Sequence, residues 1–171
     1  MYIIIITSPN IQFLLSPGND YDERKDLITF LVRYMSAFLL LDVELEVQSN
    51  AIDVKTNLFK LDGLEYEITI ERKSKSAKAL EVFSLFDVLV NKVTSTYYSV
   101  IGLFEHMLVE DKQEILGRAC GDRVACISLR SCSSPQSLVG TVAHETLHTF
   151  GIDHNSSHRC LMNAVANEDE W

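Results

Sequence analysis

The order of apolar segments along the 171-residue chain predicts an α/β fold in a single domain, residues 1–171. Short apolar runs typical of strands alternate with longer amphipathic segments typical of helices. A composition that is 47% hydrophobic gives a chain of this length enough apolar side chains for a substantial core. No internal repeat, low-complexity tract or linker divides the sequence. We therefore expect one sheet with helices packed on it.

The first half of the chain is expected to contain one helix and three strands. Residues 8–19 contain two prolines and a glycine, which predicts a loop. The helix should run over 20–40, because a capping pair opens that segment and apolar residues follow at helical spacing. A turn is expected at 62–63, where Asp precedes Gly. Continuous or alternating apolar residues predict the strands at 2–7, 43–47 and 64–70.

The second half should add two helices and two strands. Residues 76–91 have the apolar spacing of an amphipathic helix. Residues 110–122, which lie between the predicted strands at 100–104 and 123–130, are polar and contain glycine. Ser134 followed by Pro135 is a favourable helix start, because Ser caps the first free N–H groups and Pro fits the first turn. A third helix is therefore expected after residue 134.

The motif that predicts chemistry is HETLHTFGIDH, residues 144–154. Positions four apart share one face of a helix, so His144 and His148 can direct two imidazoles to one metal ion. Glu145 stands where metallopeptidases of the HExxH type keep their general base. Gly151 should end the helix, because Gly adopts a left-handed conformation at little cost. The chain can then turn back and bring His154 up as a third ligand.

The length of this motif makes a chance match improbable. HExxH alone should occur by chance in roughly one chain per hundred or two of this length. The added Gly and third His lower that frequency to about one in 10⁵. The longer form therefore predicts a zinc centre, and a satisfied surface or core histidine is the weaker interpretation.

HExxHxxGxxH with a later Met is the metzincin pattern, and the spacing that follows narrows it further. After His154 come Asn155, four residues, and then Cys160-Leu161-Met162. In archaemetzincins the third His is followed by Cys, four residues, Cys-x-Met and a later Cys-x-x-Cys. Residues 115–119 and 124–130 also look like the segment that precedes the zinc helix in that family. The chain resembles an archaemetzincin from about residue 100 to Met162.

This resemblance implies an α+β zincin-like fold with a mixed sheet and a zinc-binding helix. Residues 1–151 would form an upper subdomain, and residues 152–171 a very short C-terminal lower one. Met162 would be the Met-turn residue below the three imidazoles, a soft side chain rather than a ligand. The resemblance also implies an edge strand that binds extended substrate. Its expected residues are Val124, Cys126 and Ser128.

Two departures from the archaemetzincin pattern affect the second, four-cysteine zinc site of that family. Asn155 replaces the first Cys, and no Cys-x-x-Cys follows Met162. His158 and Cys160 remain, but two ligands do not close a tetrahedral site. We therefore expect one catalytic zinc ion and no second structural one. The segment from residue 155 onward should be loose or held by packing alone.

The expected ligand set predicts a hydrolytic mechanism. Three neutral histidines leave the zinc ion its charge and an open position for water. Zinc lowers the pKa of that water, and Glu145 can take its proton as general base and return it to the departing amine. The sequence therefore predicts a zinc metallopeptidase that hydrolyses peptide bonds without a covalent nucleophile.

Two alternatives remain open at this point. Some HExxH enzymes use a downstream carboxylate as third ligand, and residues 168–170 offer Glu, Asp and Glu. The chain could also be a non-catalytic or weakly active zinc-stabilised module that binds a partner. Peptide hydrolysis that depends on Glu145 separates the second alternative from the enzyme.

Charge and composition limit the classes of molecule that the chain can be expected to bind. The chain has 15 basic and 24 acidic residues and a net charge of −9, which argues against nucleic acid and anionic membranes as ligands. No targeting or membrane-spanning segment is recognised, and the four cysteines read as reduced thiols. We expect a cytoplasmic monomer whose partner is a peptide or protein substrate.

Overall fold

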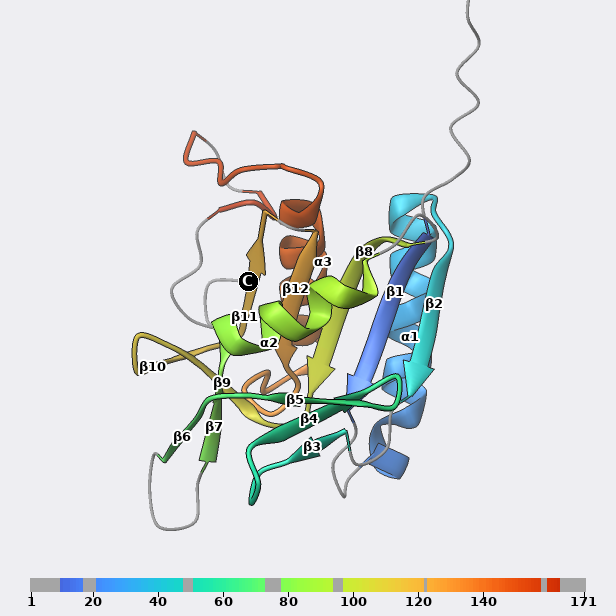
Figure 1. Ribbon diagram of the computed structural model, residues 1–171. Coiled ribbons are helices and arrows are strands. Elements are labelled where there is room, and N and C mark those ends of the chain that lie inside the picture. Colours follow the sequence, from blue (N-terminus) through green and yellow to red (C-terminus); the bar gives the residue numbers. More distant parts are fainter. Residues whose placement is uncertain are drawn as a thin grey trace, which may run out of the picture.

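A five-stranded sheet forms the centre of the molecule, a computed structural model that describes residues 10–16, 21–47, 51–72, 78–93, 97–121, 123–157 and 160–163. The strand order is β11-β12-β8-β1-β2 (Figure 1). Four of these strands run parallel, and β11 pairs antiparallel with β12 at one edge. The sheet is therefore mixed. Its strands are β1 (Asn10–Ser16), β2 (Val43–Val47), β8 (Tyr97–Phe104), β11 (Gly117–Cys120) and β12 (Val124–Ser128).

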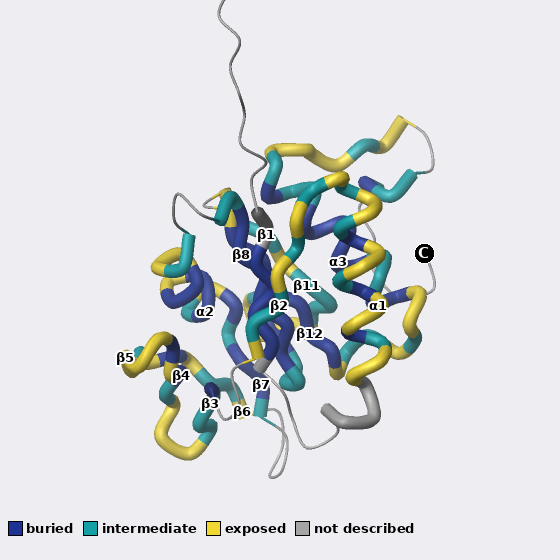
Figure 2. Tube along the Cα trace, turned by 90° about the vertical axis from the view of Figure 1, so that its right-hand side faces the viewer, coloured by how far each residue is buried: buried dark blue, intermediate teal, exposed yellow. Residues whose placement is uncertain are grey.

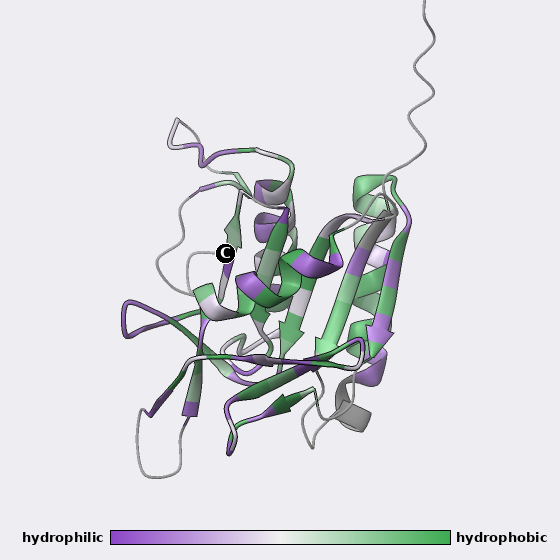
Figure 3. Ribbon diagram, viewed as in Figure 1, coloured by the Kyte–Doolittle hydropathy of each residue, from purple (hydrophilic) through white to green (hydrophobic). Residues whose placement is uncertain are grey.

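Helices cover both faces of this sheet. Helix α1 (Tyr21–Leu39) and helix α3 (Pro135–Thr149) pack side by side on one face. Helix α2 (Val82–Leu89) crosses the other face and continues into the 3-10 turn η1 (Val90–Lys92). Strands covered on both sides are expected to be apolar throughout, and Figure 3 shows this for much of β1 and β8. No helix in the described part of the chain is long and apolar enough to cross a membrane.

The sheet separates two cores, because successive side chains of a strand point to opposite faces. Ala125 and Ile127 of β12 pack with α1 and α3 in one core. Val124 and Cys126 of the same strand pack with α2 in the other. Figure 2 shows the buried residues gathered along the strands and the inner sides of the helices. The mixed α/β fold class predicted from the sequence is confirmed.

The expectation of a single sheet is wrong, because two smaller sheets extend from the central one. The first has the order β10-β9-β7-β6, and the second is the three-stranded β3-β4-β5. Together they comprise β3 (Ile52–Asp53), β4 (Leu58–Leu61), β5 (Leu64–Glu67), β6 (Ile70–Arg72), β7 (Lys78–Glu81), β9 (Met107–Glu110) and β10 (Gln113–Ile115). The strand predicted at 64–70 is divided between the two sheets. The break covers Ile68 and Thr69, and the Thr69 N–H bonds the Ser84 hydroxyl at 3.0 Å.

Several predicted elements agree with the structure. Helix α1 occupies the predicted 20–40 segment, and β2 coincides with 43–47. The predicted turn at 62–63 joins β4 to β5, with positive φ at both residues. Strand β8 includes the predicted strand 100–104, and β12 falls within the predicted strand 123–130. The predicted strand at 2–7 lies outside the described residues.

The loop predicted at 8–19 is corrected, because β1 occupies residues 10–16 and lies between β8 and β2. Phe13 and Leu15 face one core and Leu14 the other, and all three are almost fully buried. The flanking prolines and glycine suggested a loop, but this apolar run has the composition of a strand buried on both faces.

The start of the predicted 76–91 helix is also wrong. Residues 78–81 form β7, which pairs with β6 and β9. The Glu81 carboxylate then accepts hydrogen bonds from the N–H groups of Phe83 and Ser84, at 3.2 and 2.9 Å. This side-chain cap sets the first helical residue at Val82. The polar segment 110–122 likewise contains β10 and β11.

Gly102 in the middle of β8 gives a test of core packing. A Cβ atom at this position would lie 2.6 Å from a ring carbon of Phe104 and 2.9 Å from Leu89 Cδ1. The Phe104 ring is fully buried and packs edge-on against Phe59, so it has little room to move. Gly102→Ala should lower the free energy of unfolding by about 1–3 kcal/mol, measured by denaturant titration.

Gly121→Ala is the matched control, because a Cβ atom there would meet nothing within 4 Å. Equal stability changes in the two variants would contradict the packing described around Gly102.

Candidate metal centre

Helix α3 begins and ends with the local signals that the sequence predicts. The Ser134 hydroxyl accepts a hydrogen bond from Ser137 N–H at 3.1 Å, and Pro135 occupies the first turn. At the other end Gly151 has φ of +80°. Its N–H bonds His148 O at 2.9 Å, and Ile152 N–H bonds Leu147 O at 3.3 Å. This is the Schellman arrangement, and it reverses the chain so that residues 152–154 lie back along the helix.

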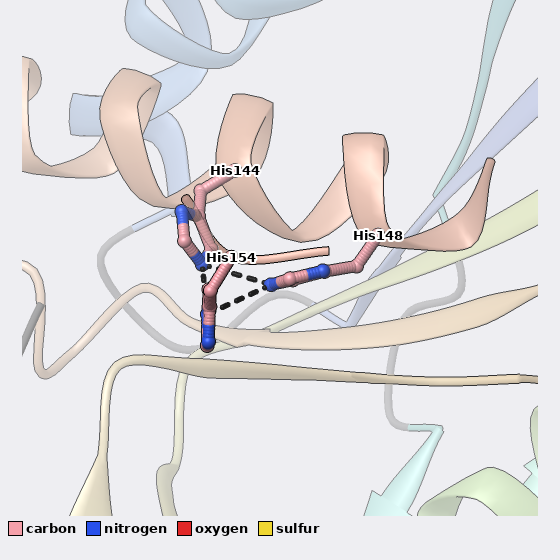
Figure 4. Close-up of side chains that lie close together, drawn as sticks. All are labelled: His144, His148 and His154. Carbon is pink, nitrogen blue, oxygen red and sulfur yellow. Dashed lines mark hydrogen bonds between the residues drawn. The ribbon is translucent and has the colours of Figure 1, made fainter. Parts of the chain in front are cut away.

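This reversal brings the three predicted metal ligands together. The Nε2 atoms of His144 and His148 are 3.0 Å apart, and His154 Nε2 lies 3.1 Å from the first and 3.0 Å from the second. Figure 4 shows the three rings converging from the helix and the following segment. Within the described residues they form a group that could hold a metal ion. His144 is buried, His148 half-buried and His154 exposed, so the group opens to solvent on one side.

The other ring nitrogens show which atoms face inward. His144 Nδ1 bonds Leu161 O at 2.8 Å, and His148 Nδ1 bonds Ile152 O at 2.7 Å. A carbonyl oxygen only accepts, so both Nδ1 atoms carry the proton. Burial lowers the pKa of both imidazoles, which favours their neutral forms. In a neutral ring with a protonated Nδ1, Nε2 carries only a lone pair.

The short contact between His144 Nε2 and His148 Nε2 therefore joins two acceptors and is repulsive in the absence of a cation. Carbonyl-held histidines with inward Nε2 atoms are the usual support of a metal site. A tetrahedral zinc ion with Zn–N distances near 2.0–2.1 Å requires nitrogens roughly 3.3 Å apart. The observed 3.0–3.1 Å is close to that spacing. The three residues fit a zinc ion.

Glu145 follows His144 on α3 and is almost completely buried. Its carboxylate accepts a hydrogen bond from the backbone N–H of Ala119 on β11. Burial raises the pKa of Glu145 to about 7, while the positive charge of Arg118 and the Ala119 N–H act against this shift. The carboxylate is thus held between α3 and the edge strand of the central sheet.

Gly117 allows this close approach of helix and strand. A Cβ atom at Gly117 would lie 2.9 Å from Glu145 Cγ and 3.0 Å from Thr141 Cγ2. Sequence analysis did not identify Gly117 or Ala119 as site residues. The signal was present, since both lie in the 115–119 segment that resembles the archaemetzincin pattern and one of them is glycine.

The strand predicted to bind substrate is not at an edge. Strand β12, which carries Val124, Cys126 and Ser128, pairs with β8 on one side and β11 on the other. All five of its residues are buried. A peptide has no free backbone groups to pair with there, so this assignment is corrected. The edge of the central sheet on this side is β11.

The free side of β11 can be assigned from the pattern of its hydrogen bonds. Leu116 O accepts from Ser128 N–H, so the backbone groups of Leu116 point towards β12. In an antiparallel pair this direction alternates, so Gly117 and Ala119 point their N–H and C=O groups away from the sheet. Those outward groups lie where the Glu145 carboxylate packs.

Met162 lies in a turn after the third histidine. Asn163 N–H bonds Cys160 O at 3.1 Å and closes the turn, and Met162 is buried within it. The residue before it, Leu161, supplies the carbonyl that holds His144. His158 and the carboxylates at 168–170 lie outside the described residues.

Comparisons with known proteins support the fold. No protein-family model and no curated protein sequence matches the chain. The solved structure of archaemetzincin from Methanopyrus kandleri is similar, with a TM-score of 0.69, 18% identity, and coverage of 99% of this chain and 88% of that one. A zinc-dependent peptidase from Methanocorpusculum labreanum has a TM-score of 0.60, 15% identity, and coverage of 94% and 91%. The chain therefore has an archaemetzincin-like fold, as its histidine motif and the spacing to Met162 predict.

Proposed function

We propose that this chain is a zinc-dependent metallopeptidase of the metzincin type. The observation that carries the proposal is the convergence of three histidine Nε2 atoms, two of them from the helix that also carries the buried Glu145. The two similar structures, one an archaemetzincin and one a zinc-dependent peptidase, support it. The substrate would be a peptide or protein.

His144, His148 and His154 would hold one zinc ion. When bound, zinc supplies Lewis-acid activation of water and of a substrate carbonyl. Within the described residues the three histidines are the group with enough ligands for such an ion. The carbonyls of Leu161 and Ile152 fix two of the rings in the ligand tautomer.

Glu145 would act as the general base and then as the general acid. One oxygen of its carboxylate takes the proton of the attacking water and then passes it to the nitrogen of the departing amine. The Ala119 N–H holds the carboxylate, and the missing side chain at Gly117 leaves room for it. No covalent nucleophile from the protein takes part in this scheme.

The free side of β11 would bind the substrate as an added strand. Gly117 offers its outward N–H and C=O groups to an extended peptide, and Ala119 offers its C=O, because the Ala119 N–H is bonded to Glu145. A peptide paired there runs past Glu145, because that carboxylate packs against the same two residues.

The proposal also keeps residues 1–151 as the upper subdomain and residues 152–171 as the lower one. Met162 would be the Met-turn residue below the imidazoles.

Metal binding tests the ligand set first. His154→Ala should weaken zinc binding by more than about tenfold, because it removes one of three ligands. The measurement is zinc stoichiometry by elemental analysis, with the dissociation constant from chelator competition. The wild type should contain one zinc ion per chain.

His106→Ala is the matched control, since His106 lies outside the ligand group. Full zinc occupancy in His154→Ala would instead favour a downstream carboxylate as the third ligand, and loss of zinc in Glu168→Ala would identify it.

Peptide hydrolysis tests the role of Glu145. Glu145→Gln keeps a side-chain oxygen for the Ala119 N–H but cannot accept the proton. It should lower kcat/KM by about 10²–10⁴-fold on a broad peptide library, with zinc content unchanged. Glu65→Gln is a suitable control, because Glu65 on β5 pairs with Lys60 at 2.9 Å on an exposed surface and is not among the groups that shift the Glu145 pKa.

Equal turnover by the wild type and Glu145→Gln would reject the proposed mechanism. Absence of turnover in a zinc-loaded wild type across the whole library would instead support a non-catalytic module stabilised by zinc.

A further inference from the structure

The Asn163 side chain closes the loop that follows the third histidine, and the Asn155 side chain makes a local turn beside it. Asn163 Nδ2 donates to Asn155 O at 2.5 Å, and Asn163 Oδ1 accepts from Cys160 N–H at 2.6 Å. Asn155 Oδ1 in turn accepts from Ser157 N–H at 2.8 Å and from its hydroxyl at 2.7 Å. Hydrogen bonds as well as packing therefore hold 155–157 and 160–163, the parts of this loop that the structure describes, so the expectation of packing alone is wrong there. A loose segment from residue 155 onward stays a prediction.

Asn163 uses both ends of its amide on the backbone of this loop. An amide offers an acceptor oxygen and two donor hydrogens, so one side chain can join two segments of backbone. A further backbone bond runs beside it, from Asn155 N–H to Met162 O at 2.8 Å. Both peptide groups of Asn155 are thereby fixed to the 160–163 turn.

These contacts connect two of the three candidate metal ligands. Asn155 directly follows His154, so fixing its peptide groups also fixes the backbone that carries the His154 ring. Met162 directly follows Leu161, whose carbonyl accepts from His144 Nδ1–H at 2.8 Å. The support of the first ligand and the backbone of the third are therefore held in one hydrogen-bonded unit.

We propose that Asn155 and Asn163 form a clamp that positions His144 and His154 for metal binding. The proposal deepens the proposed function and rests on its zinc site, but not on peptide hydrolysis. Binding a metal requires the loop to be ordered, and a loop already ordered loses less conformational entropy on binding. The clamp supplies that order through the neutral amide of Asn163 and the backbone of Asn155.

Removing the clamp should weaken zinc binding without peptide being involved. Supporting groups of metal ligands typically account for about 10–100-fold in affinity, so Asn163→Ala should raise the zinc dissociation constant by that factor. In cobalt(II)-substituted protein the visible absorption spectrum of Asn163→Ala should also change, because it reports the geometry of the ligands.

Asn91→Ala is the matched control. Asn91 Nδ2 donates to the carbonyls of Asp87 and Val88, at 2.9 and 3.1 Å, so this substitution also deletes side-chain bonds to the backbone. Zinc affinity and the cobalt spectrum should remain those of the wild type. An Asn163→Ala variant with wild-type zinc affinity and spectrum, or an equal loss in Asn91→Ala, would overturn the clamp.

Asn163→Asp distinguishes the two bonds of the amide. It keeps an acceptor for Cys160 N–H but replaces the donor with a second oxygen that faces Asn155 O. Zinc binding as weak as in Asn163→Ala supports the clamp, whereas wild-type affinity contradicts it. This variant also provides a readout if Asn163→Ala does not fold, which circular dichroism would show.

The results separate the clamp from the enzyme. A wild type that binds zinc and cleaves no peptide rejects the proposed function and leaves the clamp standing. Tight zinc binding by both Asn163 variants rejects the clamp and leaves the function. A wild type that binds no zinc rejects both.

Discussion

The repulsion between the inward-facing Nε2 atoms of His144 and His148 is the constraint on which the site depends. Lone pairs 3.0 Å apart are stable only if a cation lies between them and other groups hold the rings. Two backbone carbonyls do this for His144 and His148. Both carbonyls belong to the segment that follows α3, so the helix alone cannot hold these two rings in place.

Three contacts fix the end of α3 against the central sheet. The Ser99 hydroxyl bonds the Thr149 hydroxyl at 2.9 Å, which joins the last helical residue to β8. One residue on, the Phe150 ring stacks on Tyr98 with centroids 5.1 Å apart. The Arg123 guanidinium covers Tyr98 at 5.2 Å. These contacts hold the helix end against the sheet, so that the turn at Gly151 starts from a defined position.

Sequence reasoning succeeded where local chemistry decides the structure, and it failed where the decision is made by pairing between distant segments. The cap at Ser134 and the helix stop at Gly151 depend only on their neighbours, so they were predictable. Strand β1 was missed because both of its partners are far along the chain. Strand β7 pairs with the nearby β6 and the distant β9, and it was missed because its apolar residues continue directly into those of α2. The prediction assigned substrate binding to β12 for the same reason as it missed β1, because nothing in the local sequence shows that β11 pairs with its outer side.

Hydrogen-bonded amides and a metal–cysteine site impose different conditions on this loop. A structural zinc site orders its segment only when metal is bound and thiols are deprotonated. The Asn163 amide is neutral at all ordinary pH values, so its two bonds require neither condition. Order in the loop can then precede metal binding, whereas the inward imidazoles still need a cation. Under the proposed function, only the histidine centre then requires the metal, and the Asn163 amide orders the loop beside it.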